Sequence, residues 1–573
     1  MIRFTRDPWD PRSLQGPAVA IVLLALLASV TSLANGFAYD DRWIIADNPN
    51  VHDPAHWWNV FGETYWPTTR NAALYRPLTI LAYQVQWAVG GADPLLFHTV
   101  NVILYAAVSA MVLLVAAEVM PFAAAWVAAA LFAVHPVHVE AVGNVVGQAE
   151  LWSSLTTLGA LLAYLRGRRD GQRISRERGV IIAGLYFGGM LFKENAIVLP
   201  ALLAAAEAFL VVDARPWRER LDEFVTLGVC LTLLAAIVLG VRVLVTGEIG
   251  GDVEHPALRT LGMRERSWVM LAIAPEFARL LLWPARLYAD YSPQMVPVLT
   301  SSSPGHANGA LLVLCLIVLA IVSAKRFPLA TFALAWLAVT AAPTANILIP
   351  TGILLAERTL FLPSVGVMMV VAAVVPWCLG QLRSAPRSAR MGAAGVLAIV
   401  LVAGGSRSAE RQRAWKDSTT VFRTLAADAP DSFKAHYANG GMLWEARRPG
   451  EAEREWRYAI ALFPQYFGVY QDLAHKYREA HVCPAAIPLY LKALEIEPAL
   501  PYSRIGLAAC HLEVSQWRAA RSAARVAIAD GMYRKAFEFI IERADSALVA
   551  NDSLDGANRW GKKPRILTRS RSE

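Results

Sequence analysis

Long apolar runs separated by short arginine clusters constrain the fold of this chain more than any other feature of its sequence. Hydrophobic residues make up 56% of its 573 residues and charged residues only 17%, and the mean hydropathy is +0.38. A soluble chain of this length needs more charge to cover its surface, so we predict a polytopic bundle of about eleven transmembrane helices. The predicted spans are residues 18–33, 94–117, 121–134, 150–165, 179–192, 196–212, 223–246, 311–324, 328–343, 360–381 and 391–405.

The arginine clusters predict the topology of this bundle. Basic residues at 3–12, 166–178, 215–220, 325–326 and 383–390 all fall on the cytoplasmic side when residues 77–89 and 268–284 are read as interfacial or re-entrant helices. Arg407, Arg411 and Arg413 run against this rule on the outer side. The formal charge of +8 is therefore topological and predicts no nucleic-acid partner.

The five cysteines give no metal-binding or disulfide signature. No CxxC spacing is present, and Cys230, Cys315 and Cys378 lie in apolar runs. Cys483 and Cys510 could face an oxidising compartment and form a disulfide, but free thiols are the favoured interpretation. The first apolar run lacks a small-residue cleavage site, so we read it as a retained helix that delivers residues 37–93 to the outer side as a long polar loop.

An internal repeat with a period of 34 residues follows the apolar part of the chain. Small, large and proline positions recur together at Ala452, Ala486 and Ala520, at Ala459, Ala493 and Ala527, at Trp456 and Tyr490, at Leu473 and Leu507, and at Pro464 and Pro498. Small alanines let paired helices approach and one large residue fills the gap, which is typical of a tetratricopeptide α-solenoid.

Polar residues gather in four clusters that the topology places at the outer membrane face. Charges beside a membrane are costly enough to indicate a cavity or a partner, although snorkelling of Lys193 and Arg358 remains an alternative. The outer loop carries Asp40, Asp41, Tyr75 and Arg76, with His98 and Asn101 beginning the next span. The other clusters are His135, His138 and Glu140 with Gln148 and Glu150, then Lys193 and Glu194, and finally Glu357 and Arg358.

The two histidines of the second cluster allow two readings. His135 and His138 lie three residues apart with Glu140 nearby, which could serve a metal ion. Packing at a helix end near the interface is the simpler interpretation. We therefore predict no metal ligands, and a divalent metal stays an open alternative.

The order of these motifs resembles the transmembrane-and-tetratricopeptide-repeat O-mannosyltransferase family, and more broadly the GT-C membrane glycosyltransferases. The resemblance covers nearly the whole chain, including the repeats. Gln148 stands where the family usually has arginine, and Phe361 where it usually has tyrosine. The matching segments are 37–41, 75–78, His98 with Asn101, 135–142, Lys193 with Glu194, and Glu357 and Arg358 with 362–364.

The resemblance implies a sugar, expected to be mannose, carried on a polyprenyl phosphate and transferred with inversion to a hydroxyl of a protein acceptor, with no separate cofactor. Asp40 or Asp41 would be the general base. Donor-phosphate ligands would be Arg76, His135, His138, Lys193 and Arg358, because fixed cations and hydrogen-bond donors stabilise a leaving phosphate. Supporting residues would be Tyr75, His98, Asn101, Glu140, Gln148, Glu150, Glu194 and Glu357.

We therefore predict an all-α protein with a GT-C-like transmembrane domain over residues 1–410. Its outer-face loop is 37–93, its tetratricopeptide domain 411–545 holds a half unit plus about three repeats and binds the acceptor polypeptide, and a disordered basic tail covers 546–573. The expected location is a bacterial inner membrane, with the active site and the repeats in the periplasm. The rival hypotheses are a non-catalytic membrane scaffold that recruits proteins and a lipid or solute transporter.

Overall fold

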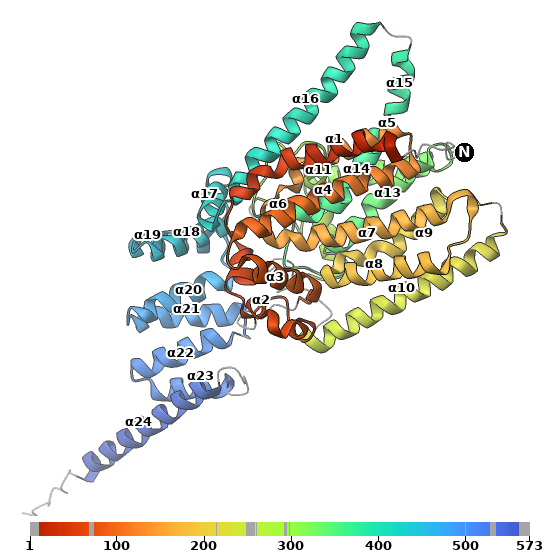
Figure 1. Ribbon diagram of the computed structural model, residues 1–573. Coiled ribbons are helices and arrows are strands. Elements are labelled where there is room, and N and C mark those ends of the chain that lie inside the picture. The colour runs from red at the N-terminus through yellow and green to blue at the C-terminus, as the bar shows by residue number, and fades with distance from the viewer. Residues whose placement is uncertain are drawn as a thin grey trace, which may run out of the picture. The chain divides into compact units, whose positions relative to one another are not determined.

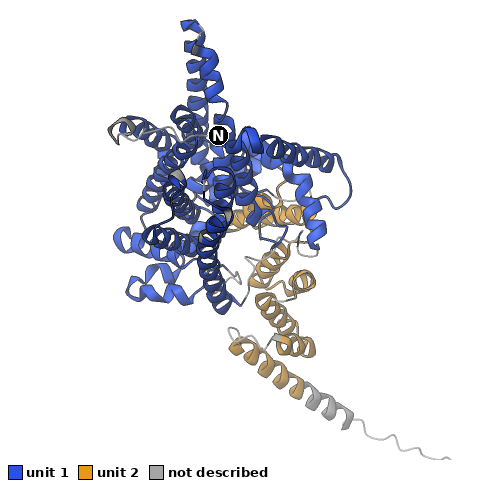
Figure 2. Ribbon diagram, turned by 90° about the vertical axis from the view of Figure 1, so that its right-hand side faces the viewer, with its two compact units in different colours: residues 1–430 blue, residues 431–573 orange. Residues whose placement is uncertain are grey.

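The computed structural model describes residues 11–67, 74–213, 215–247, 258, 261–291, 295–296, 298–383, 386–498, 500–527 and 534–560. Within these ranges every regular element is helical. The chain divides into two compact units, residues 1–430 (unit 1) and 431–573 (unit 2), which Figure 2 shows in blue and orange. An all-α fold is what the apolar runs and the repeat predicted.

Unit 1 contains the apolar helices of the chain (Figure 1). Its first helices are α1 (Pro11–Ser29), α2 (Pro49–His52), α3 (Pro77–Gly90), α4 (Pro94–Val119), α5 (Phe122–Ala133), α6 (Val139–Gly143), α7 (Gln148–Gly167), α8 (Arg176–Phe192) and α9 (Leu199–Phe209). The others are α10 (Trp217–Thr246), α11 (Met263–Leu282), α12 (Pro304–Arg326), α13 (Pro328–Ala341), α14 (Phe361–Ala372), α15 (Val375–Arg383), α16 (Arg387–Gln412) and α17 (Ser418–Asp428).

Six helical segments among the described residues are long and apolar enough to cross a membrane. They are 15–34, 94–119, 218–246, 304–326, 357–382 and 387–415, and the bent pair 122–133 with 136–143 makes a seventh if it counts as one span. The remaining predicted runs lie in α7, α8, α9 and α13, where α8, α9 and α13 have 17, 11 and 14 residues. Helices α8, α9 and α13 are shorter than about 20 residues, and α7, with 20, is not among the six apolar segments, so the count of eleven stays a prediction.

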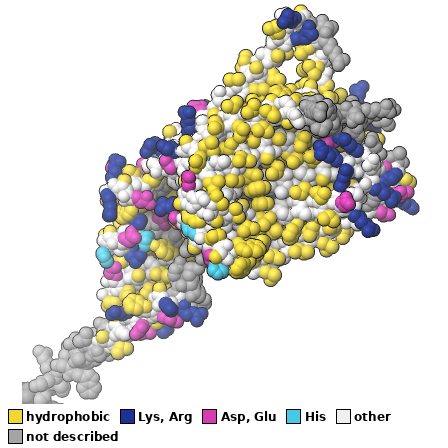
Figure 3. All heavy atoms as spheres, viewed as in Figure 1, with side chains coloured by type: hydrophobic (Ala, Val, Ile, Leu, Met, Phe, Trp, Pro, Cys, Tyr) yellow, Lys and Arg dark blue, Asp and Glu magenta, His cyan; other side chains and the backbone are white. Residues whose placement is uncertain are grey.

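The flank of unit 1 seen in Figure 3 has the character of a membrane surface. Hydrophobic side chains cover its middle, whereas Lys and Arg side chains gather at the end that carries the connection between α9 and α10. The span 218–246 is only 11% buried and the span 304–326 also 11%. Apolar side chains that protein does not cover need lipid around them.

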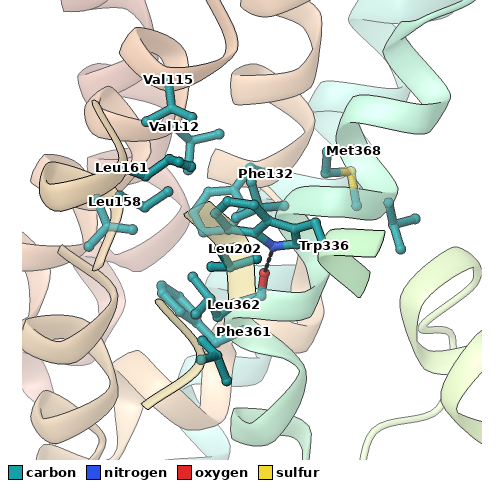
Figure 4. Packing of buried hydrophobic residues seen from close by; sticks show 14 of the residues in the cluster. Val112, Val115, Phe132, Leu158, Leu161, Leu202, Trp336, Phe361, Leu362 and Met368 are labelled. Atoms are coloured by element: carbon teal, nitrogen blue, oxygen red, sulfur yellow. Dashed lines mark hydrogen bonds between the residues drawn. The ribbon is translucent and has the colours of Figure 1, made fainter. Parts of the chain in front are cut away.

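The core of unit 1 depends on small residues that let helices approach closely. Six alanines of α5 are buried against its neighbours: Ala124, Ala125, Ala128, Ala129, Ala130 and Ala133. A Cβ atom on Gly366 of α14 would lie 2.6 Å from the carbonyl oxygen of Ala333 in α13. The indole N–H of Trp336 donates to the Leu362 carbonyl at 2.8 Å, so its polar atom is satisfied within the apolar cluster of Figure 4.

One end of unit 1, here called the loop face, carries the connections that hold the candidate site. These are the segment between α1 and α4, residues 134–147, the turn between α8 and α9, and residues 342–360. Both ends of α11 also contact this face: Arg266 donates to the Asn346 carbonyl at 3.0 Å, and the Leu281 carbonyl lies 3.1 Å from His135 Nε2. Helix α11 therefore begins and ends near the same face, as an interfacial or re-entrant helix does.

The lead-in to the repeats belongs to unit 1. Trp415 and Val421 are buried in one cluster with Ala38 and Val139, because α17 packs against the loop face. The compact division of the chain consequently falls at Pro430, twenty residues after the predicted boundary at 410.

Unit 2 consists of helices, several of which are joined by short turns. They are α18 (Phe433–Glu445), α19 (Pro449–Leu462), α20 (Phe467–Glu479), α21 (Cys483–Ile496), α22 (Pro501–Glu513), α23 (Trp517–Ala527) and α24 (Arg534–Trp560). Left-handed residues recur in these turns at Arg447, His481 and Ser515, with φ of 61°, 58° and 60°. The backbone thus repeats with the 34-residue period of the sequence.

The buried side chains of unit 2 follow the same period. Ala452, Ala486 and Ala520 have no exposed surface, and Trp456 and Tyr490 are almost completely buried. A Cβ atom on Gly440 would lie 2.5 Å from Nε1 of Trp456, so this position has room only for glycine. The predicted roles of small and large residues in the helix pairs therefore match the packing.

Two expectations for unit 2 differ from the structure. Cys483 and Cys510 form a disulfide bond, with Cα atoms 5.1 Å apart, so the prediction of free thiols was wrong. The stacking of α21 on α22 brings the two residues together, and their spacing alone does not signal this. Residues 546–560 of the predicted tail are helical, because α24 continues beyond the turns that Phe537, Ile540 and Ala544 anchor. The rest of the predicted tail lies outside the described residues.

Candidate active site

Asp41 is a fully buried carboxylate that organises the loop face. Its Oδ2 accepts the backbone N–H groups of Ala38 at 3.1 Å and Val145 at 3.2 Å, and its Oδ1 accepts that of Val146 at 2.8 Å. Burial raises the pKa of Asp41 to about 7, although these three hydrogen bonds favour the ionised form. With its oxygens used in this way, Asp41 ties the loop after α1 to residues 144–147.

Asp40 has a different environment, although it is the neighbouring residue. Its side chain is 19% exposed, and its Oδ2 lies 3.8 Å from Nη1 of Arg358. The same Nη1 lies 3.2 Å from Oε1 of Glu140, whose Oε2 accepts the Arg358 backbone N–H at 2.9 Å. Asp40 thus presents a carboxylate beside a cation that Glu140 holds in place.

Tyr39, the residue directly before these two carboxylates, has a left-handed backbone. Tyr39 has φ of 54°, its N–H donates to Ser418 Oγ at 3.0 Å, and its ring packs edge-on against Phe422 with centroids 5.4 Å apart. Packing against α17 therefore stabilises a conformation that a bulky residue rarely adopts. Asp40 and Asp41 follow this turn in a helical conformation, in which successive side chains point about 100° apart, so Asp41 faces the protein interior while Asp40 faces Arg358.

Two further ion pairs lie at the loop face. Arg76 forms a bidentate ion pair with Glu194, in which Nε donates to Oε2 at 3.0 Å and Nη2 donates to Oε1 at 2.6 Å. Lys193 pairs with Glu150, and their side chains are only 9% and 2% exposed. The predicted cations Arg76, Lys193 and Arg358 thus each have an acidic partner from the predicted set. The sequence predicted these residues as site residues, but it did not predict which of them form ion pairs.

A buried network of side-chain amides supports the loop face from the protein interior. Asn101 Nδ2 donates to the carbonyls of Val142 and Asn144, at 3.2 Å each. Gln148 Nε2 donates to Asn101 Oδ1 at 2.8 Å, and Gln86 Nε2 donates to Gln148 Oε1 at 2.8 Å. These bonds fix the turn whose N–H groups bind Asp41, so Asn101 and Gln148 act through that turn.

Tyr65 is a site residue that sequence reasoning missed. It is almost completely buried, and the Arg76 guanidinium lies 4.9 Å from the centroid of its ring. Burial raises the pKa of Tyr65 to about 12, and the charges of Arg76, Asp40 and Arg358 all act on its hydroxyl. Tyr65 therefore packs against the guanidinium of the Arg76–Glu194 pair. An aromatic residue in a Trp-rich loop gave no signal of this position.

Comparison with known proteins finds relatives that match most of this chain. A mouse protein named Protein O-mannosyl-transferase TMTC3 is 26% identical over 498 residues, which cover 82% of this chain and 53% of the relative. Drosophila Tmtc3 is 25% identical over 621 residues, covering 94% and 66%, and human TMTC4 is 26% identical over 469 residues, covering 73% and 63%. The chain is TMTC-like. It spans between 53% and 66% of the length of these three relatives. No protein-family model matches it.

Both departures of the TMTC-like chain from the family pattern are buried. Gln148 is part of the amide network, and Phe361 packs edge-on against His138 with centroids 4.8 Å apart. An amide at position 148 fits its neighbours, because it both donates to Asn101 and accepts from Gln86.

Two predicted phosphate ligands of the TMTC-like chain have protein partners at their ring nitrogens. His138 Nδ1 lies 3.1 Å from the Tyr105 hydroxyl and its Nε2 2.9 Å from Ser364 Oγ. His135 Nδ1 accepts the Val137 N–H at 3.3 Å and its Nε2 faces the Leu281 carbonyl. Protein groups thus contact both ring nitrogens of each histidine, and a role of His135 and His138 as phosphate ligands stays a prediction.

Three of the predicted supporting residues also have protein partners. His98 Nε2 lies 3.2 Å from the Gly36 carbonyl, and the Tyr75 hydroxyl donates to the Phe61 carbonyl at 3.0 Å. Glu357 Oε1 accepts from the Tyr288 N–H at 2.6 Å and the Tyr291 hydroxyl at 2.8 Å. Within the ranges that the structure describes, no three His, Cys, Asp or Glu side chains are placed to bind a metal ion.

Proposed function

We propose that the TMTC-like chain is a membrane glycosyltransferase that moves mannose from a polyprenyl phosphate to a hydroxyl group of a protein acceptor. The relatives it matches are named protein O-mannosyltransferases. The observation that carries the proposal is the partly exposed Asp40, which lies beside Arg358 at the loop face while Asp41 is used up in hydrogen bonds.

Asp40 is the general base of the proposed reaction. It takes the proton of the acceptor hydroxyl as the oxygen attacks C1 of the sugar, while the bond from C1 to the phosphate oxygen breaks and the lipid phosphate leaves. A carboxylate is a weak base toward an alcohol, but attack on an oxocarbenium-like carbon acidifies the hydroxyl. The single displacement inverts the anomeric configuration.

Arg358 and Arg76 stabilise the charge of the departing phosphate. Their side chains are 18% and 12% exposed, so they are accessible yet shielded from bulk water. In such surroundings a charge-assisted hydrogen bond is stronger than in water. Glu140 and Glu194 orient the two guanidinium groups, and Lys193, paired with Glu150, holds the fold of the site.

The proposed topology has about eleven spans with the loop face on the outer side, in the periplasm if the membrane is a bacterial inner membrane. The disulfide between Cys483 and Cys510 supports an oxidising compartment for unit 2.

We propose that unit 2 is a tetratricopeptide solenoid that binds the acceptor polypeptide. Deleting residues 431–573 should then raise the acceptor KM at least tenfold and leave transfer to a short peptide nearly unchanged; an unchanged acceptor KM contradicts this role.

The reaction itself is tested with the full chain in lipid nanodiscs. Labelled mannose on a polyprenyl phosphate, β-linked, is offered with a Ser/Thr-rich polypeptide, and polyprenyl-phosphate glucose serves as the control donor. We expect an α-mannosyl product that an α-mannosidase removes. A β-linked product contradicts inversion, and the absence of product from both donors contradicts the enzyme.

A non-catalytic scaffold is the second candidate. The observation that favours it is that Arg76, Lys193 and Arg358 all pair with carboxylates in this structure. In that case the full chain should bind polypeptides through unit 2 while transferring no sugar. The same nanodisc assay separates the two functions.

A further inference from the structure

A run of hydroxyl residues, Thr300 to Ser303, directly precedes α12. At no other place in the chain are four consecutive residues all serine or threonine. Thr300, Ser301 and Ser302 are exposed and lie outside any helix. Among the residues that the structure describes, their hydroxyl groups have no hydrogen-bond partner. The run therefore presents three accessible nucleophilic oxygens on an irregular backbone.

The run lies at the outer end of α12 in the proposed topology. Helix α12 carries Lys325 and Arg326 in its last turn, and basic residues mark the cytoplasmic end of a membrane helix. Its first turn packs on α11, since a Cβ atom on Gly305 would lie 3.3 Å from the carbonyl oxygen of Ala272. Because α11 begins and ends near the loop face, the run lies on the side of the membrane that carries the candidate site.

The segment that leads to the run is held beside the candidate site. The Tyr288 N–H and the Tyr291 hydroxyl both donate to Glu357 Oε1, and Glu357 directly precedes Arg358. Thr300 follows Tyr291 by nine residues, so even a fully extended chain keeps it within about 32 Å of Tyr291. The run is thus confined to the surroundings of the site.

Both ends of the run are fixed by the fold. Val298 packs against the core of unit 1, and Ser303 begins α12, where its N–H donates to His306 Nδ1 at 3.2 Å. A general base must lie within about 3 Å of the hydroxyl that it deprotonates. Among the described residues, Asp40 included, none contacts the three exposed hydroxyls. The fixed run is therefore not placed to use Asp40 of its own chain.

A second hydroxyl run at the same face offers a comparison within the chain. Ser418, Thr419 and Thr420 begin α17, and the Ser418 hydroxyl accepts the Tyr39 N–H at 3.0 Å. The Thr420 N–H donates to Asp417 Oδ1 at 2.7 Å, so this run is capped and helical. Its hydroxyls are consequently held close to a helix, whereas those of residues 300–302 stand on an open segment.

We propose that Thr300, Ser301 and Ser302 are O-mannosylated by a second copy of this enzyme in the same membrane. The proposal rests on the proposed function and names an acceptor for it. In this step a hydroxyl oxygen of the run attacks C1 of the sugar, and the bond from C1 to the phosphate oxygen breaks. The proton passes to Asp40 of the second copy and the lipid phosphate leaves.

The geometry of the membrane favours this acceptor. Two copies with the same orientation present their outer faces at the same height, so lateral diffusion brings the exposed run of one copy to the site of the other. Asp40 is only 19% exposed, and a hydroxyl on an open segment reaches such a recessed carboxylate more easily than one on a helix.

The test uses the full chain in proteoliposomes with labelled polyprenyl-phosphate mannose and no added acceptor. Mass spectrometry of proteolytic peptides should find hexose on residues 300–302 and none on residues 418–420. Alanine at Thr300, Ser301 and Ser302 together should lower the incorporated label about 10-fold or more. The same variant should transfer mannose to an added Ser/Thr-rich polypeptide as wild type does, because the three exposed side chains support no contact of the fold.

A tagged Asp40→Asn protein separates transfer between copies from transfer within one copy. It should stay unlabelled alone and gain hexose on residues 300–302 when wild-type protein shares its vesicles. Diluting the protein about 10-fold in lipid should lower the initial rate of labelling per copy by the same factor, because the reaction then depends on the meeting of two copies.

Mannose on the added polypeptide but not on residues 300–302 overturns the proposal and leaves the enzyme in place. Labelling of Asp40→Asn in the absence of wild type, or a rate per copy that dilution does not change, overturns transfer between copies. Absence of transfer to both the polypeptide and the run refutes the proposed reaction and this acceptor together.

Discussion

The buried pair of Lys193 and Glu150 allows a test of whether this lysine supports the fold or acts on the donor. The two side chains are 9% and 2% exposed, so neither charge is solvated once its partner is removed. Lys193→Met keeps the length of the side chain and leaves the Glu150 carboxylate without its counter-ion. Breaking a buried pair in this way costs about 3–5 kcal/mol.

The double variant Lys193→Met with Glu150→Gln removes both charges and should return to within about 1.5 kcal/mol of the wild type, because replacing both partners avoids an isolated buried charge. Reversible unfolding in mixed micelles, followed by tryptophan fluorescence, measures these differences. Lys476→Met is the control, since its pair with Glu479 is 26% and 44% exposed and contributes less than about 1 kcal/mol.

Equal losses of stability in the single and the double variant would refute the reasoning, because the cost would then not come from an uncompensated charge. The double variant also separates structure from chemistry. If Lys193 only supports the fold, the stable double variant keeps most of its sugar transfer. A stable but inactive double variant would instead return Lys193 to the donor phosphate.

Three further predictions concern other residues of the chain. Burial raises the pKa of Asp41 to about 7 from an unfolded value of about 4, so the unfolded chain loses this proton first as the pH rises. The free energy of unfolding should therefore fall by up to about 4 kcal/mol between pH 4 and pH 7. Asp41→Asn mimics the protonated form and should remove this pH dependence in thermal unfolding scans. Serine at both Cys483 and Cys510 opens a loop of 27 residues and should destabilise unit 2 by about 3.5 kcal/mol, measured by limited proteolysis of the full chain; equal protease resistance contradicts this. Glu140→Gln should loosen its hold on Arg358 and lower kcat about 10-fold at an unchanged acceptor KM, and a rise in acceptor KM alone would contradict that positioning role.

Much of the fold could be predicted because it follows from one-dimensional patterns. Apolar runs such as 94–117 and 223–246 predicted α4 and α10, and the 34-residue period predicted buried alanines that the structure places in helix pairs. The short helices α9 and α13 were harder, because 11 and 14 residues do not by themselves show whether a segment spans a membrane.

The site was predictable as a set of residues but not as a set of contacts. Asp40 and Asp41 look alike in sequence, but in the structure Asp40 lies beside Arg358 while Asp41 accepts three backbone N–H groups. The pairing of Arg76 with Glu194 joins residues far apart in the chain, which no local pattern encodes.

The most direct test of the account compares Asp40→Asn with Asp41→Asn in the polyprenyl-phosphate mannose assay, with Asp53→Asn as a control from the same loop. Turnover is expressed per folded molecule, using the unfolding amplitude of each preparation. The account predicts that Asp40→Asn loses at least about 100-fold in kcat, as removal of a general base does, while Asp41→Asn and Asp53→Asn stay within a few-fold of wild type. Full activity in Asp40→Asn, or a loss confined to Asp41→Asn, would contradict the assignment of Asp40 as the base.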